Sequence, residues 1–299
     1  MKKYLILFLK GVGMGVANVI PGVSGGTIAL ITNIYEELVN TLRSFDRKAL
    51  ELLFSFKMKE LAKYTNLYFL TAVFSGSIIS VFTIAILFEY LFANYPVLIW
   101  SLFFGLIVAS VIFVGKRVQN WNIKSTITLI LGTTIAISLS FMEPATENSN
   151  LLFVFICGII GISGMMLPGL SGSYILILLG NYKLLMVTAV TELDISLLGI
   201  FFLGSVFGLI SFSHLLSWVL TRYKDATLAL LTGFILGSLN IIWPWKQITK
   251  SIKINDEVKI IAYNSNLPAE IDSNTLFAII LMIAGFLLVY LLENSSKNK

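Results

Sequence analysis

The residues best suited to chemistry in this chain are two short motifs that begin with proline and glycine and continue with serine. The first reads Pro21-Gly22-Val23-Ser24-Gly25-Gly26-Thr27, and the second reads Pro168-Gly169-Leu170-Ser171-Gly172-Ser173. Proline and glycine interrupt a helix, and serine is a preferred cap of the helix that follows. The first amides of that helix have no partner within it, and glycine lets a ligand approach them closely. Each motif therefore predicts a helix start that can face a bound group.

The charge at a helix start favours an anion as that group. A helix N-terminus carries roughly half a positive charge, and phosphate and carboxylate groups are its usual ligands. The alternative is that both motifs only shape a turn and satisfy its backbone. Arg222 adds a cation at a tight turn near a membrane boundary. The predicted substrate-binding residues are Ser24, Gly25, Gly26, Thr27, Ser171, Gly172, Ser173 and Arg222.

Two ionisable residues lie within apolar segments and are candidates for coupling to an ion. Glu89 is the only charged residue between Thr65 and Phe92, and an intramembrane carboxylate is a functional candidate by default. It could also lie at the level of the lipid headgroups. His214 lies well inside its segment, where it could relay protons or form a hydrogen bond to a neighbouring helix.

The composition of the chain indicates an integral membrane protein. Of its 299 residues, 57% are hydrophobic and 12% are charged, and the mean hydropathy is +0.89. Soluble domains carry about 25% charged residues, so a water-soluble fold could not hide this much apolar surface. The net charge of +5 therefore gives no reason to expect nucleic acid as a partner. With one cysteine, Cys157, and one histidine, neither a disulfide framework nor a metal centre is expected, and no cofactor is predicted.

Long stretches without charged residues predict the elements that position the motifs. A membrane-spanning helix needs about 20 apolar residues. The predicted spans are residues 66–92, 97–115, 125–142, 195–221, 226–244 and 274–292. The two segments that contain the motifs could each cross once with a kink, or enter and return as a re-entrant hairpin.

The distribution of basic residues distinguishes these two topologies. If both motif segments cross the bilayer, 7 basic residues lie inside and 14 outside; if both are re-entrant, 16 lie inside and 5 outside. Cytoplasmic loops carry the excess of lysine and arginine, so the second topology is favoured. It predicts a hairpin at 4–39 that enters from the cytoplasm, a cytoplasmic connector at 40–64, and a hairpin at 150–187 that enters from outside. Both termini are then cytoplasmic.

The two halves of the chain also repeat each other. Six residues around the first motif recur 147 residues later, and a second set of five recurs after 128 residues. The first set is Gly11, Pro21, Gly22, Ser24, Gly25 and Tyr35; the second is Gly76, Ser77, Tyr95, Gly105 and Ser110. Each half, 1–145 and 146–299, holds one hairpin and three spans, so the halves have opposite orientations. The predicted fold is an all-α polytopic membrane protein with two inverted repeats, the architecture of many secondary transporters.

These motifs resemble a bacterial membrane family long known only as a domain of unknown function and now associated with undecaprenyl-phosphate (polyprenyl-phosphate) translocation. The resemblance is carried by the run from Lys10 to Thr27, by Leu167–Ser173, and by Leu231-Thr232-Gly233-Phe234. It implies a flippase in the bacterial inner membrane, which returns the lipid carrier phosphate from the outer to the cytoplasmic leaflet for envelope polysaccharide synthesis. Many members carry an aspartate where this chain has Asn18. Asn18 is thus a third coupling candidate, although its amide leaves proton coupling through this position in doubt.

Other functions fit parts of the same pattern. A carrier or channel for a small soluble anion would use the same helix starts. Gly22-Val23-Ser24-Gly25 and its repeat also resemble the nucleophile motif of rhomboid intramembrane proteases, with His214 as the base, but one histidine cannot serve two serines. A purely structural scaffold gives no reason for two breaks at membrane depth. We expect a transporter rather than an enzyme, and the oligomeric state stays open, with a homodimer as one option.

Overall fold

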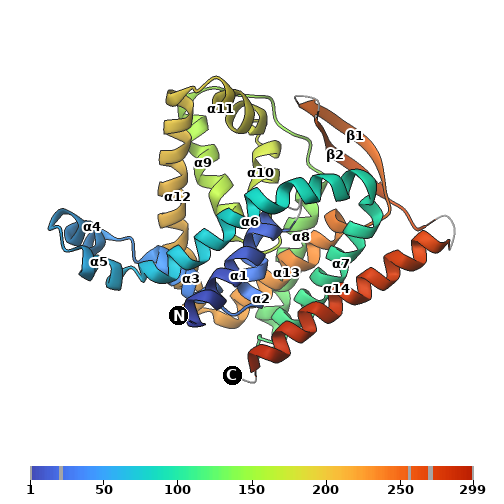
Figure 1. Cartoon of the computed structure of the whole chain (residues 1–299), viewed down its shortest axis with the longest axis horizontal. Coiled ribbons are helices and arrows are strands. Elements are labelled where there is room, and N and C mark those ends of the chain that lie inside the picture. The colour runs from blue at the N-terminus through green and yellow to red at the C-terminus, as the bar shows by residue number, and fades with distance from the viewer. Residues whose placement is uncertain (1, 20–22, 255–256, 269–271, 298–299) are drawn as a thin grey trace.

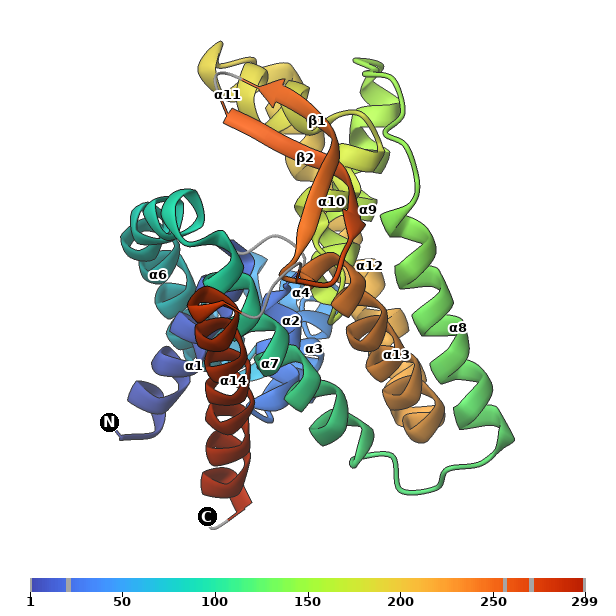
Figure 2. The same cartoon turned by 90° about the vertical axis from the view of Figure 1, so that its right-hand side faces the viewer.

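The structure is a computed structural model that describes residues 2–19, 23–254, 257–268 and 272–297. Within these ranges the chain is mainly helical, with one two-stranded antiparallel sheet. The first helix begins and the last helix ends at the same end of the molecule (Figures 1 and 2). The β hairpin and α11 lie at the opposite end.

Six helices of the described chain are long and apolar enough to cross a membrane. They confirm the six predicted spans. Their bounds are α6 (Leu67–Asn94), α7 (Pro96–Gly115), α8 (Ile123–Ser140), α12 (Ile195–Arg222), α13 (Lys224–Ile242) and α14 (Ser273–Lys297). The chain is therefore a multi-pass membrane protein.

Short polar residues and one proline mark where four of these helices begin. Pro96 opens α7, where its fixed dihedral suits the first turn and its missing N–H is not needed. The side chains of Asn122, Asp194 and Asp272 accept hydrogen bonds from backbone amides in the first turns of α8, α12 and α14, at 2.8–3.0 Å. Such caps satisfy donors that have no partner within a helix.

The two motif-bearing segments are broken helices, as the prolines and glycines predict. The first consists of α1 (Lys2–Val19), α2 (Gly25–Ile31) and α3 (Tyr35–Arg43), and Pro21 and Gly22 lie outside the described residues. The second consists of α9 (Leu151–Met166), α10 (Gly172–Leu178), the π-helix η1 (Leu184–Thr188) and α11 (Ala189–Thr191). Helix α1 enters from the end that holds the termini, whereas α9 enters from the opposite end (Figure 2). The start of α2 meets the second break, with Ser24 bonded to Leu167 and Thr27 to Gly169.

Glycines bring each broken segment close to the first long helix of its own half. A Cβ atom at Gly11 of α1 would clash with the carbonyl group of Val73 on α6, and one at Gly158 of α9 would clash with that of Phe201 on α12. The two glycines are 147 residues apart and their partners are 128 apart, which are the two offsets of the sequence repeat. Reciprocal contacts follow the same offsets, with Gly76 against Phe8 and Gly204 against Phe155.

The remaining long helices pair across the two halves. Gly105 of α7 lies against the backbone of Met282 on α14, and Gly233 of α13 lies against that of Leu129 on α8. Helix α7 of the first half thus packs on α14 of the second, and α13 of the second half packs on α8 of the first. These helix pairs, each with one helix from either half, hold the two halves together.

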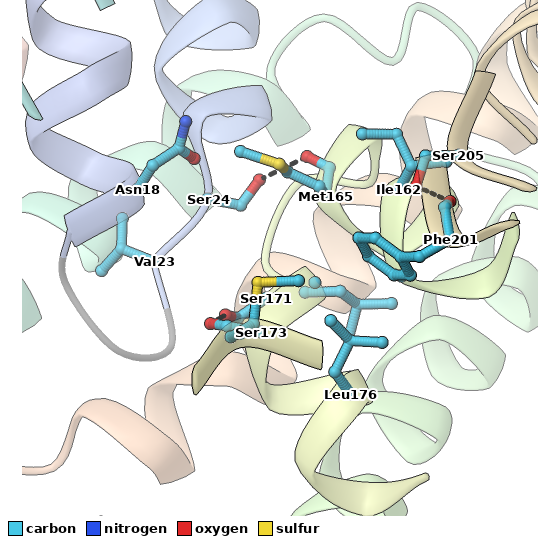
Figure 3. A pocket seen from close by; sticks show the side chains of 14 residues that line it. Asn18, Val23, Ser24, Ile162, Met165, Ser171, Ser173, Leu176, Phe201 and Ser205 are labelled. Atoms are coloured by element: carbon cyan, nitrogen blue, oxygen red, sulfur yellow. Dashed lines mark hydrogen bonds between the residues drawn. The ribbon is translucent and has the colours of Figure 1, made fainter. Parts of the chain in front are cut away.

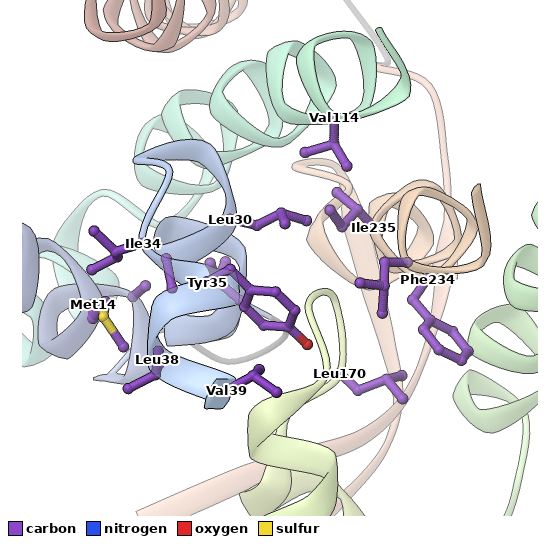
Figure 4. Packing of buried hydrophobic residues seen from close by; sticks show 14 of the residues in the cluster. Met14, Leu30, Ile34, Tyr35, Leu38, Val39, Val114, Leu170, Phe234 and Ile235 are labelled. Carbon is purple, nitrogen blue, oxygen red and sulfur yellow. The ribbon is translucent and has the colours of Figure 1, made fainter. Parts of the chain in front are cut away.

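A buried apolar cluster fills the space between the two breaks (Figure 4). It joins Leu30 of α2 and Tyr35 of α3 to Val114 of α7, Leu170 of the second break and Ile235 of α13. Each of these side chains is buried. The cluster fixes the broken segments relative to the spanning helices, because close-packed side chains resist displacement.

Two further parts of the chain lie outside this helical body. Helices α4 (Arg47–Phe54) and α5 (Met58–Tyr64) form an arm beside α3 within the predicted connector (Figure 1). Strands β1 (Lys246–Ile254) and β2 (Glu257–Ser265) form an antiparallel hairpin between the predicted spans 226–244 and 274–292. The all-α expectation therefore needs this one addition.

Candidate functional site

A cavity of about 270 Å³ lies where the two broken segments meet. Its walls come from the end of α1, the loop before α2, and α9, α10, η1 and α12. Figure 3 shows Ser24 on one side of this space and Ser171 and Ser173 on another. Met165 and Phe201 are among the apolar side chains that complete the lining. The structure brings these predicted residues together in the cavity: Asn18, Ser24, Ser171, Gly172 and Ser173.

The amides at the start of α2 already have acceptors. The Asn18 Oδ1 atom accepts a hydrogen bond from the amide of Gly25 at 2.7 Å, and the Ser24 hydroxyl accepts one from the amide of Gly26 at 3.0 Å. The amide of Thr27 donates to the carbonyl oxygen of Ser24 at 2.9 Å. The first motif therefore satisfies its own helix start in this conformation, and its expected amide donors do not face a ligand.

Hydroxyl groups of the first broken segment instead hold the second one. The Ser24 hydroxyl donates to the carbonyl oxygen of Leu167 at 3.1 Å, and the Tyr35 hydroxyl donates to that of Met166 at 3.0 Å. The Thr27 hydroxyl accepts a hydrogen bond from the amide of Gly169 at 3.0 Å. Ser24, Thr27 and Tyr35 are all buried. We call these three residues the tip clamp.

The second motif is arranged differently. The hydroxyl oxygens of Ser171 and Ser173 lie 2.9 Å apart, and the amide of Tyr174 approaches the Ser171 hydroxyl at 3.4 Å. Among the described residues, no acceptor is paired with the amides of Gly172 and Ser173. Ser173 is exposed, whereas the corresponding residues of the first motif, 25–27, are buried. The second motif thus offers donors that a bound group could use.

Gly169 shapes this second break. Its φ angle is +80°, in the left-handed region that glycine adopts without steric cost. A Cβ atom there would also clash with the backbone of Phe234 on α13. Both the turn and the close packing therefore require glycine at this position.

Two cations hold the far end of α2. The Lys10 ammonium donates to the carbonyl oxygen of Thr32 at 2.6 Å. The Arg117 guanidinium donates to the carbonyl oxygens of Leu30 at 2.7 Å and Ile31 at 3.1 Å. Cations are favoured at a helix C-terminus because the last carbonyl groups carry partial negative charge. Arg117 also forms an ion pair with Glu293 on α14, with a nitrogen–oxygen distance of 3.3 Å.

Arg222, His214 and Thr27 do not line the cavity. Arg222 ends α12, is exposed, and has its guanidinium 5.8 Å from the ring centroid of Tyr223. His214 is partly buried on α12, where its Nδ1 atom lies 2.9 Å from the carbonyl oxygen of Ile210. Thr27 is buried beside the cavity in the tip clamp. Glu89 belongs to α6, and its side chain lies outside the described residues.

Sequence reasoning did not assign roles to Tyr35 and Arg117. Tyr35 recurs as Tyr182 in the repeat, which drew attention to its position. The sequence did not predict its hydrogen bond to Met166. Arg117 follows directly after a predicted span, where a cation is usually a boundary anchor. Its partners are backbone carbonyl groups more than 80 residues away, and no sequence motif reports such a contact.

Comparison with known proteins places the chain in a family. The model of the undecaprenyl phosphate translocase-like family matches residues 14–261. A polyprenyl-phosphate transporter of Vibrio cholerae serotype O1 is 40% identical, covering 99% of this chain and 98% of its own. A polyprenyl-phosphate transporter of Staphylococcus aureus is 30% identical over 80% of this chain and 86% of its own. No solved structure matches the chain. By this family match, and by its similarity to the Vibrio relative along nearly its full length, the chain belongs to the undecaprenyl phosphate translocase-like family.

Proposed function

We propose that this protein moves undecaprenyl phosphate from the outer to the cytoplasmic leaflet of the bacterial inner membrane, where the carrier is reused for envelope polysaccharide synthesis. The main support for this proposal is the cavity between the two broken segments, with the hydroxyls of Ser24, Ser171 and Ser173 at its wall. Similarity to two polyprenyl-phosphate transporters supports a lipid phosphate as the substrate.

The chemistry of the cavity suits the headgroup of such a lipid. Hydroxyl groups and the amides of Gly172 and Ser173 can donate hydrogen bonds to phosphate oxygens. The apolar side chains around them lower the local dielectric constant, which strengthens each of these bonds. None of the described residues that line the cavity carries a charge. Neutral donors can shelter an anion across the low-dielectric core without holding it so tightly that it is not released, while the prenyl chain stays in the lipid.

The arrangement of the halves supports alternating access. We propose that residues 1–145 and 146–299 are inverted repeats, each with a re-entrant hairpin, and that both termini are cytoplasmic. The glycine contacts that recur at both sequence offsets support the repeat. The entry of α1 and α9 from opposite ends supports hairpins of opposite orientation. The excess of basic residues at the end that holds the termini supports the cytoplasmic assignment.

One polar contact between α3 and α12 fits the role of a closed gate. The Ser217 hydroxyl on α12 accepts a hydrogen bond from Arg43 at 3.0 Å and donates to Asn40 at 2.8 Å. Lys224 and Glu36 form an ion pair at 2.8 Å beside it. The N-terminal half of α12 lines the cavity, so we propose that its C-terminal half closes the cytoplasmic path here. Release of the headgroup requires this contact to open, and Arg222 then meets the phosphate at the cytoplasmic boundary.

The proposal is tested with purified protein in liposomes that contain labelled polyprenyl phosphate. Wild-type protein should move the label between leaflets, and Arg222→Ala should slow this movement while the protein still inserts. Uptake of inorganic phosphate in the same vesicles tests the soluble-anion alternative. Transport of inorganic phosphate without movement of the lipid would contradict the proposed substrate.

A further inference from the structure

The arm formed by residues 46–64 is a defined structure rather than a loose connector. The Asp46 carboxylate caps α4 by accepting a hydrogen bond from the amide of Ala49 at 3.1 Å. The same carboxylate accepts one from the Tyr64 hydroxyl at 2.7 Å, which ties the two ends of the arm together. The Lys48 ammonium lies 4.8 Å from the Tyr64 ring centroid and adds a cation–π contact. These contacts at its base fix the direction in which the arm projects.

The free end of the arm exposes large apolar side chains. Phe54 and Phe56 are 78% and 84% exposed, and Leu50, Leu53 and Met58 are exposed beside them in the sequence. Leu50, Leu53 and Phe54 are three and four residues apart, so they share one face of α4. The other exposed apolar residues of the protein lie mostly on the spanning helices, where lipid covers them. Nothing in the described chain covers the apolar end of the arm.

The backbone at Phe56 adds a second observation. Its φ angle is +55°, and the amides of Phe56 and Lys57 donate to the carbonyl oxygens of Leu53 and Leu52. This is the helix-ending turn at which glycine is usual, because a side chain there costs about 1 kcal/mol or more. A phenylalanine that is 84% exposed gains no packing within the protein to offset that cost. Its ring is therefore placed for contact with something outside the chain.

The charge and position of the arm identify that partner. Residues 46–64 carry five basic and three acidic side chains. Arg47 with Glu51 and Lys57 with Glu60 form exposed ion pairs of 3.6 Å, which leaves Lys59 and Lys63 as additional positive charge. The arm projects sideways next to α3 (Figure 1), whose Glu36 pairs with Lys224 at the start of α13. The base of the arm thus lies near the turn between α12 and α13, where two spanning helices end.

We propose that the arm is an interfacial anchor that inserts Phe54 and Phe56 among the acyl chains and binds anionic lipid headgroups through its lysines. Aromatic and leucine side chains on one face with lysines beside them are typical of segments that lie in the membrane interface. The second half has only η1 and α11 between α10 and α12, so the anchor acts on one leaflet alone. The inference does not depend on which substrate the protein carries.

The test measures how deeply the arm enters the bilayer of the intact protein. Phe54→Cys and Arg47→Cys proteins are labelled with an environment-sensitive fluorophore and placed in phosphatidylcholine vesicles with and without phosphatidylglycerol. Arg47 is the matched control because its side chain is 94% exposed on the same helix. The native Cys157 is buried, and unsubstituted protein gives the labelling background.

Brominated lipids should quench the label at position 54 strongly and the label at position 47 weakly, and phosphatidylglycerol should increase the difference. Aqueous iodide should show the reverse order. Equal iodide quenching at both positions would overturn the proposal. So would quenching that changes with protein density and not with lipid composition, because a second copy of the chain would then cover the arm. Substituting Lys59→Gln and Lys63→Gln together in the labelled protein should remove the effect of phosphatidylglycerol, while brominated lipids still quench the label at position 54.

Discussion

The Ser24 hydroxyl oxygen lies 3.1 Å from the carbonyl oxygen of Leu167, a residue 143 positions later in the chain. The two motifs that resemble each other in sequence are thus in direct contact. They do not play the same role in this conformation. The first motif provides Ser24 and Thr27 of the tip clamp, whereas the second places Ser171 and Ser173 at the cavity.

The tip clamp should contribute to stability through its buried hydrogen bonds. Thr27→Val removes the acceptor of the Gly169 amide and keeps the shape of the side chain. A buried donor left without a partner costs about 1–3 kcal/mol, so thermal unfolding in detergent should occur at a lower temperature. Thr27→Ser retains the hydroxyl and should unfold close to the wild-type temperature. A Thr27→Val protein that unfolds at the wild-type temperature would show that the hydrogen bond to the Gly169 amide does not contribute to stability.

Replacing glycine by alanine should change the stability of the protein in opposite directions at two positions. A Cβ atom at Gly158 would meet the backbone of Phe201, so Gly158→Ala should destabilise the protein by about 1–3 kcal/mol. A Cβ atom at Gly199 on α12 would have no other atom within 4 Å. Gly199→Ala should therefore stabilise the protein by up to about 1 kcal/mol. Unfolding midpoints of both variants under one condition test this. A neutral Gly158→Ala would contradict the described packing of α9 on α12.

Arg117 should not be replaceable by lysine. Its guanidinium contacts two carbonyl oxygens at the end of α2 and the Glu293 carboxylate together, a geometry that a single ammonium cannot reproduce. Arg117→Met leaves the buried Glu293 without this partner and should lower stability by about 3–5 kcal/mol. The double variant Arg117→Met with Glu293→Leu should be less destabilised than Arg117→Met. Additive effects would mean that the two side chains do not interact.

The contact between α3 and α12 should open during transport. Asn40→Cys and Ser217→Cys replace two side chains whose polar atoms lie 2.8 Å apart. Oxidation should join these cysteines and stop lipid movement, and reduction should restore it. Each single variant, treated with the same oxidant, is the control. Continued transport by the cross-linked protein would mean that this contact is not a gate.

The sequence was sufficient for the six spans and for the positions of both breaks, since apolar length and helix breakers are local signals. It could not show which hydrogen bonds the motifs make. In the sequence the amides of Gly25 and Gly26 looked like free donors, yet Asn18 at the end of α1 and Ser24 directly before α2 accept hydrogen bonds from them. The role of Arg117 depends on carbonyl groups of α2, which are distant in sequence. The β hairpin was not predicted, although apolar and polar residues alternate in Ile252–Ile254 and Val258–Ile260, a pattern typical of strands.

The central claim is that the second motif binds the phosphate of a lipid. The most direct measurement is the rate at which proteoliposomes move labelled polyprenyl phosphate between leaflets, compared for wild type, Ser171→Ala with Ser173→Ala, and Ser163→Ala as a control. Ser163 lies on α9 and bonds within its own helix, to the carbonyl oxygen of Ile159. We predict that the double variant inserts and stays folded but loses most of the transport, while Ser163→Ala retains it. Wild-type transport by the double variant would contradict the proposed site.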